Sequence, residues 1–273
     1  MEVSPKKFHI AVFPWLAFGH ISPFFELAKL IAQKGHKISF ISTPRNIKRL
    51  SKLPPNLQPL VQFIELTLPH IENLPENAEA TMDIPTHIVP YLKKAFDGLQ
   101  QPLIEFLEKS NPDCFIYDFG PYWLPPILSK LGILSIYFSI YSAFGMSFVV
   151  ELIVGKPTDD DNIISDVHHE QNESGVSDIL RVKETVFGAD FIAIRSCMEI
   201  EGVKVERNDE HDGKFTRDSV TKALRSVMVN EEGKCYRSNA KEMSKIVGDM
   251  ELHQKYLDDF VDYVELQISA SKH

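Results

Sequence analysis

The stretch Phe13-Pro14-Trp15-Leu16-Ala17-Phe18-Gly19-His20-Ile21-Ser22-Pro23 links a strand pattern to a helix pattern near the start of the chain. The apolar run at residues 8–13 predicts a buried strand. Ser22 can cap a helix over residues 23–34, which begins with a proline and stops at a glycine. His20 is therefore expected on a loop at the carboxyl edge of a sheet, where ligands of open α/β folds bind.

The side chain of His20 suits proton transfer. An imidazole titrates near neutral pH, so at this edge it can take a proton from a bound hydroxyl group. A histidine that only stabilises the turn is the alternative, and position alone favours neither interpretation.

The first two thirds of the chain alternate strand-like and helix-like segments, as a parallel sheet requires. The sequence therefore predicts a doubly wound, Rossmann-like α/β fold. Residues 67–86 contain three prolines and few strong helix or strand formers, so they are expected to form a long loop that can border a pocket. Strands are predicted at 8–13, 37–41, 61–66, 114–117, 133–138 and 191–194, and helices at 23–34, 46–51, 99–109, 121–130 and 177–187.

Asp118 follows the predicted strand at 114–117, which we expect in the same sheet as the first strand. A carboxylate there can accept the imidazole N–H of His20, fix its tautomer and stabilise the cation that forms on proton transfer. The alternative is a carboxylate that only stabilises a turn or caps the next helix.

Three stretches, residues 19–32, 35–43 and 113–118, carry a family resemblance. Gly-His-Ile-Ser-Pro followed by Phe-Phe-Glu-Leu-Ala-Lys-Leu-Ile-Ala, then Gly-His-Lys-Ile-Ser-Phe-Ile-Ser-Thr and Asp-Cys-Phe-Ile-Tyr-Asp, resemble plant UDP-sugar-dependent glycosyltransferases. Those enzymes have the GT-B architecture of two Rossmann-like domains. Within the family, the chain is most similar to branch-forming enzymes, such as rhamnosyltransferases that use UDP-rhamnose and extend a flavonoid or terpenoid glycoside.

The resemblance implies roles for individual residues. His20 and Asp118 match the catalytic dyad of the family, which transfers sugar with inversion at the anomeric carbon. It also implies a small-molecule acceptor and a UDP-sugar co-substrate, with no cofactor and no metal. An apolar acceptor pocket with a few polar groups is expected near the strand ends. Its candidate residues are Phe18, Gly19, Phe119, Trp123, Ser139, Tyr141 and Ser142.

The bulk composition limits the classes of partner and compartment. A net charge of −9 without a basic stripe argues against a nucleic-acid partner. The cysteines, Cys114, Cys197 and Cys235, are few and far apart, which suits a reducing cytosol rather than a disulfide framework. The sequence therefore predicts a cytoplasmic protein.

Two segments allow a second interpretation. Residues 133–154 have Glu151 as their only charge and are long enough for a membrane span, but their serines favour a buried strand followed by a buried helix. Residues 158–175 contain three consecutive aspartates and a His-His-Glu run, yet they lack the ligand spacing of a metal site and are expected to form a solvated loop.

The chain changes character after Glu201, where polar helical patterns replace the alternating elements and neither proline nor tryptophan follows. We expect an acceptor-binding domain over residues 1–201 and a helical remnant of the donor domain over 202–273. The second segment resembles the extreme C-terminal helices of the same glycosyltransferases. Family members carry a uracil-stacking tryptophan, a His-Cys-Gly-Trp-Asn-Ser run at the diphosphate and an acidic-Gln pair, and this sequence has none of these motifs.

These features predict a glycosyltransferase that is impaired in donor binding. One alternative is a non-catalytic protein that binds the acceptor or acts as the partner of a full-length relative. The other alternative is a poorly folded remnant.

Overall fold

The computed structural model describes residues 7–141, 146, 172–194 and 249–271, with isolated positions between 222 and 238. The chain divides into two compact units, one of residues 1–195 with 261–273 and the other of residues 196–260. The predicted boundary at Glu201 lies outside the described residues and stays a prediction.

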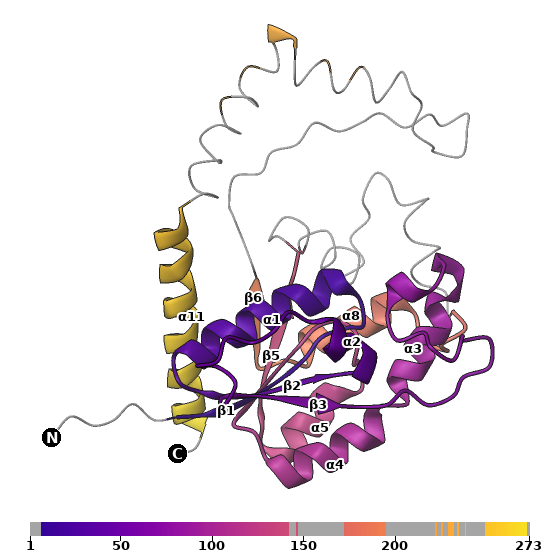
Figure 1. Ribbon diagram of the computed structural model, residues 1–273, viewed down its shortest axis with the longest axis horizontal. Helices are drawn as coiled ribbons and strands as arrows, with labels where there is room; N and C mark the ends of the chain where they lie inside the picture. Colours follow the sequence, from indigo (N-terminus) through magenta and orange to yellow (C-terminus); the bar gives the residue numbers. More distant parts are fainter. Residues whose placement is uncertain are drawn as a thin grey trace, which may run out of the picture. The chain divides into compact units, whose positions relative to one another are not determined.

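The described residues form a six-stranded sheet in the order β3-β2-β1-β4-β5-β6 (Figure 1). Every neighbouring pair is parallel, so all carboxyl ends of the strands meet at one edge. This is the strand order of a doubly wound fold. Strands β2 and β3 are added on one side of β1, and strands β4 to β6 are added on its other side. The predicted fold class is confirmed. The strands are β1 (His9–Phe13), β2 (Lys37–Ser42), β3 (Val61–Glu65), β4 (Cys114–Tyr117), β5 (Leu134–Ser139) and β6 (Phe191–Ile194).

Helices cover both faces of the sheet, with α1 on one face and α4 and α5 on the other (Figure 1). Right-handed crossovers on the two sides of the reversal require this arrangement. The helices are α1 (Phe18–Gln33), α2 (Pro44–Arg49), α3 (Val89–Asp97), α4 (Gln100–Ser110), α5 (Leu124–Leu131), α8 (Asp178–Phe187) and α11 (Met250–Ser271).

The predicted start of the first helix is wrong. Helix α1 begins at Phe18, because the carbonyl of Ala17 accepts the N–H groups of His20 and Ile21, each at 2.8 Å. Ser22 therefore does not cap the helix, and Pro23 lies inside it. His20 consequently belongs to the first helical turn rather than to a loop.

The predicted long loop at residues 67–86 is present, with a short 3₁₀ turn at Thr81–Asp83. It is held against the start of α1, since the N–H of Thr81 donates to the carbonyl of Leu16 at 2.9 Å. It is also held against α2, because Arg49 forms a bidentate ion pair with Asp83. Helix α3, which follows this loop, was not expected from the sequence.

The second half of α11, residues 261–271, belongs to the same compact unit as the sheet. Val261, Val264 and Ile268 repeat at helical spacing and are almost completely buried. Glu265 Oε1 lies 2.7 Å from His36 Nε2. The N–H of Phe8 donates to His36 Nδ1 at 3.3 Å, so a neutral His36 ring carries its proton on Nε2.

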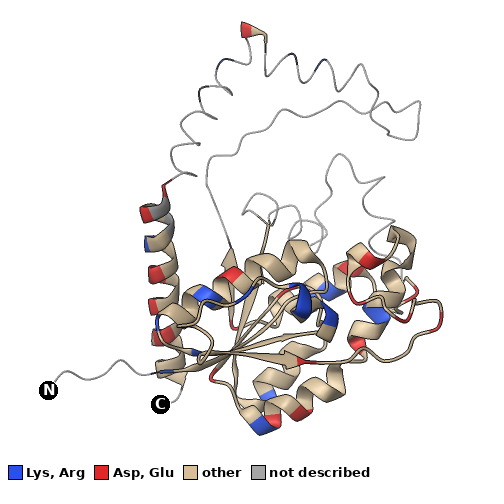
Figure 2. Ribbon diagram, in the orientation of Figure 1, with Lys and Arg blue, Asp and Glu red and all other residues tan. Residues whose placement is uncertain are grey.

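Acidic and basic residues are interspersed along the described helices (Figure 2). None of the helices within the described residues is long and apolar enough to cross a bilayer. Strand β5 occupies the first part of the apolar segment at residues 133–154. The residues of that segment after Tyr141 lie outside the description apart from Met146, which is buried.

Candidate active site

His20 and Asp118 reach the same edge of the sheet from adjacent strands. Strand β1 leads to His20 and β4 leads to Asp118, and the last residues of these strands, Phe13 and Tyr117, are partners in the parallel register. The side chains of the two site residues meet across 98 positions of sequence, with His20 Nδ1 2.8 Å from Asp118 Oδ2. Both are buried, at 8% and 2% exposure.

The buried carboxylate of Asp118 has a donor for each oxygen. Oδ2 accepts the N–H of Trp15 at 2.9 Å as well as the ring of His20, and Oδ1 accepts the N–H of Gly120 at 3.1 Å. The bond to Gly120, two residues ahead, is the local turn that was the alternative explanation for this aspartate. The structure therefore combines the turn and the histidine contact in one side chain.

This geometry determines which ring nitrogen of His20 can act as a base. An ionised carboxylate only accepts hydrogen bonds, so Nδ1 carries the proton that points to Asp118. In the neutral ring, the lone pair is then on Nε2, which is free to take a proton from a bound hydroxyl group.

Aromatic rings border the dyad. The ring of Phe119 lies 5.5 Å from that of His20, and Trp15 packs edge-on against both Phe119 and Phe96. Phe18 and Phe119 are half-buried, and Gly19 is exposed with no heavy atom within 4 Å of the position its Cβ would take. We group Phe18, Gly19 and Phe119 with His20, because Phe119 packs beside its ring and the other two precede it in the first turn of α1.

The other predicted acceptor residues do not all join this group. Trp123 is 7% exposed and belongs to the hydrophobic core. The hydroxyl of Ser139 bonds to the backbone of Tyr141 in a local turn, whereas the Tyr141 side chain is 51% exposed. Ser142 lies outside the described residues.

The sequence analysis missed two residues, Tyr137 beside the dyad and Arg49 beside Phe18. Tyr137 is the register partner of Tyr117 on β5, and burial together with the charge of Asp118 raises its pKa above the ordinary value for tyrosine. The guanidinium of Arg49 lies 5.9 Å from the ring of Phe18. No sequence signal indicated either residue, because both positions depend on the register of strands and loops that are distant in the chain.

No group of three side chains suited to hold a metal ion occurs within residues 7–141, 172–194 and 249–271 or at the other described positions. The acidic segment at residues 158–170 is outside this description.

Comparison with known proteins gives the family. Residues 6–114 match the family described as glycosyltransferase, N-terminal domain. UDP-glycosyltransferase 91A1 of Arabidopsis thaliana is 44% identical over 221 residues, which are 71% of this chain and 47% of that protein. The soyasaponin III rhamnosyltransferase of Glycine max is 48% identical over 143 residues, 52% of this chain and 30% of that protein.

A solved structure also matches, namely Arabidopsis thaliana UGT89C1 complexed with UDP-L-rhamnose, with 22% identity and a TM-score of 0.47 over 60% of this chain and 42% of that one. The chain spans about half the length of the first of these curated relatives, 47%. The chain therefore carries a glycosyltransferase N-terminal domain at residues 6–114, and over 71% of its length its sequence is similar to a plant UDP-glycosyltransferase.

Proposed function

We propose that this chain takes part in an inverting O-glycosyl transfer from a UDP-sugar to a small hydroxylated acceptor, with His20 as the base. The observation that carries the proposal is the 2.8 Å contact between His20 Nδ1 and Asp118 Oδ2. It leaves Nε2 as the nitrogen that can accept a proton.

The reaction follows from this arrangement. His20 Nε2 removes the proton of the acceptor hydroxyl while the acceptor oxygen forms a bond to the anomeric carbon of the sugar. The bond from that carbon to the diphosphate breaks, and UDP leaves with the electron pair. Asp118 stabilises the imidazolium ion that forms on His20.

The surroundings of His20 support a flat, apolar acceptor. Phe18 and Phe119 offer half-buried rings, and the open space beside Gly19 leaves room for a ligand. The Glycine max relative is named for soyasaponin III, so a terpenoid or flavonoid glycoside is the acceptor class that we propose.

The donor side is the weak part of the proposed reaction. The sequence contains no His-Cys-Gly-Trp-Asn-Ser run, and its only tryptophans, Trp15 and Trp123, belong to the core near the acceptor side. Without donors at the diphosphate, the leaving charge is poorly stabilised, and the loss of one such donor costs about 100-fold or more in rate. We therefore propose that donor binding by this chain is impaired.

A transfer assay tests the reaction. Purified chain is incubated with soyasaponin III or a flavonoid glucoside and with radiolabelled UDP-rhamnose or UDP-glucose. We expect slow transfer that falls at least about 100-fold in His20→Gln, since a positioned general base contributes that much. His87→Gln, at an exposed histidine, is the matched control and should leave the rate unchanged. Equal rates in the wild type and His20→Gln would reject His20 as the base.

Calorimetry tests the alternative, a non-catalytic acceptor-binding module or partner of a full-length relative. That alternative predicts binding of the glycoside acceptor, no binding of UDP and no transfer. Tight binding of UDP would reject it. We also propose that transfer needs no metal and no cofactor besides the UDP-sugar, so EDTA should not change the rate. We further propose that the protein is cytoplasmic.

A further inference from the structure

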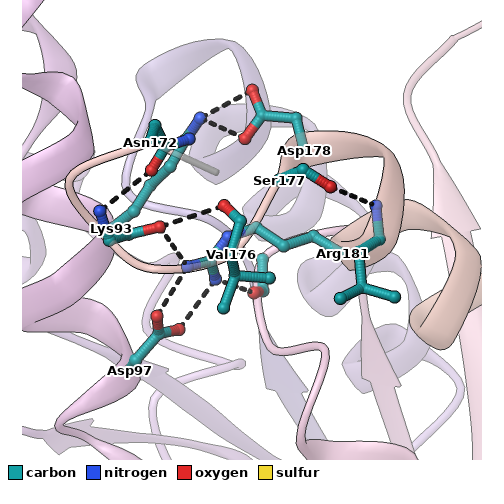
Figure 3. A network of polar contacts seen from close by, with 10 residues as sticks. Lys93, Asp97, Asn172, Val176, Ser177, Asp178 and Arg181 are labelled. Atoms are coloured by element: carbon teal, nitrogen blue, oxygen red, sulfur yellow. Dashed lines mark hydrogen bonds and ion pairs between the residues drawn. The ribbon is translucent and has the colours of Figure 1, made fainter. Parts of the chain in front are cut away.

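Arg181 of α8 is a fully buried cation, with 0% of its surface exposed. Its guanidinium forms a bidentate ion pair with Asp97 of α3, at 2.7 Å from Nη1 and 2.5 Å from Nη2 (Figure 3). Nη2 also donates to the hydroxyl of Ser174 at 3.0 Å. A buried charge needs such partners, because desolvation costs several kcal/mol for each ion.

A second ion pair joins the same two helices. Lys93 Nζ lies 2.5 and 2.7 Å from the carboxylate oxygens of Asp178 (Figure 3). Lys93 and Asp97 are one turn apart on α3, and Asp178 and Arg181 are about one turn apart on α8, so the two pairs lie on facing helix surfaces. Within the described residues, it is the pair that contains Arg181 that extends further into the protein.

The extension leads to the turn that carries Asp118. Arg181 Nη1 donates to the carbonyl of Gly120 at 3.1 Å, and its guanidinium lies 5.0 Å from the ring of Tyr122. The N–H of the same Gly120 donates to Asp118 Oδ1. One glycine therefore connects the buried cation to the carboxylate that orients His20.

Stability alone does not account for this connection. A buried ion pair is often no more stabilising than apolar side chains of similar volume, because desolvation offsets the attraction. Burial raises the pKa of Asp97 even though Arg181 acts in the opposite direction, which indicates a strongly desolvated pair. What the guanidinium adds over an apolar side chain is a directed hydrogen bond to Gly120 in a fixed planar geometry.

We propose that Arg181 is a positioning residue for the base, which holds the turn at residues 118–122 so that Asp118 keeps its hydrogen bond to His20. This inference rests on the proposed function of His20. It extends the candidate site from the sheet edge to the contact between α3 and α8.

Proton exchange at the ring of His20 tests the proposal and needs no glycosyl transfer. The protein is labelled with ¹⁵N-histidine, and the Nδ1–H resonance of His20 is assigned by its loss in His20→Gln. The variants are Arg181→Met, Arg181→Lys and the double variant Arg181→Met/Asp97→Leu, which removes both charges. Lys93→Met is the matched control, because it breaks the other ion pair between the same helices.

We expect the exchange rate of Nδ1–H with water to rise about fivefold or more in each Arg181 variant, the worth of one hydrogen bond. Lys93→Met should leave that rate unchanged. The double variant should unfold near the wild-type temperature while its exchange is still faster, which separates positioning from stability. Wild-type exchange in the double variant and in Arg181→Lys would overturn the proposal, as would an equal rise in Lys93→Met.

If His20 supports no transfer but the exchange results hold, the positioning network stands and the proposed reaction fails. If transfer is measured but the exchange does not respond to Arg181, the reaction stands and the network fails.

Discussion

The same oxygen of Asp118 that faces His20 also accepts the backbone N–H of Trp15, at 2.9 Å. Trp15 lies in the segment between β1 and α1, and His20 lies in the first turn of α1. Asp118 therefore fixes the connection that carries the histidine as well as the histidine ring itself. A change at Asp118 should disturb the local backbone in addition to the proposed chemistry.

Replacing Asp118 should lower the stability of the protein, and the loss should be larger when the new side chain has fewer hydrogen-bond acceptors. Asp118→Ala removes the acceptor of the N–H groups of Trp15 and Gly120 and of the His20 ring, and we expect the free energy of unfolding to fall by at least ~2 kcal/mol. Asp118→Asn keeps one acceptor oxygen and should cost less. Urea unfolding measures both, with Glu108→Ala, an exposed acidic residue of α4, as the control. Equal stability of Asp118→Ala and the control would contradict the network.

Gly120→Ala should be destabilising because the added methyl group has no room. Its Cβ would lie 2.9 Å from Cε1 of Phe96, a fully buried ring that stacks on Phe13. We expect a loss of about 1–3 kcal/mol, as for other overpacked sites, measured by urea unfolding.

Gly19→Ala is the matched control for this substitution, since nothing lies within 4 Å of its Cβ position and alanine favours the helix. The double variant Gly120→Ala/Phe96→Leu should recover part of the loss. A Gly120→Ala variant as stable as Gly19→Ala would show that the turn can shift freely.

The stability of the protein should depend on pH through His9. Burial lowers the pKa of His9 below the usual 6.5, against the opposing effects of a hydrogen bond with Ser110 and the charge of Asp113. The unfolded chain then binds more protons below pH 6.5, so the stabilisation is fully present above that pH and is lost as the pH falls through the folded-state pKa.

Unfolding of wild type and His9→Gln between pH 8 and pH 5 measures this contribution. Acidification should cost the wild type more stability than the variant. Parallel pH profiles would show that His9 titrates alike in the folded and unfolded chains.

Cys114 should be inert towards thiol reagents while the protein is folded. Burial, together with the charges of Asp113 and Asp190, raises the pKa of its thiol far above the ordinary value. A variant with Cys197→Ser and Cys235→Ser leaves Cys114 as the only cysteine. We expect no reaction with a chromogenic disulfide reagent in buffer and complete reaction in guanidinium chloride. Rapid reaction in buffer would show that β4 is accessible.

The buried side chains in the last turns of α11 should contribute to the stability of the protein. Ile268→Ala removes a fully buried side chain from α11 and should lower the free energy of unfolding by about 2–5 kcal/mol. Leu266→Ala, at a residue of the same helix that is 64% exposed, should change it by no more than about 0.5 kcal/mol. Similar small effects of both substitutions would mean that this end of α11 does not contribute to the fold.

The sequence alone determined the strands, their parallel arrangement and the pairing of the dyad. Short apolar runs separated by helical segments leave few alternatives to a doubly wound sheet, and carboxyl ends of adjacent parallel strands lie side by side. His20 and Asp118 each come shortly after such a run, so their meeting followed from local patterns and one topological rule.

Only the tertiary structure decided where α1 begins, that Trp123 belongs to the core, and that Arg181 reaches Gly120. Helix α1 starts at the hydrogen bonds to the Ala17 carbonyl, before the predicted cap at Ser22. The sequence next to Trp123 and Arg181 does not indicate which distant residues surround them. A buried cation within a helix such as α8 is recognisable only through partners from α3 and from the turn after β4, because its energy depends on groups that are brought together by the packing of distant segments.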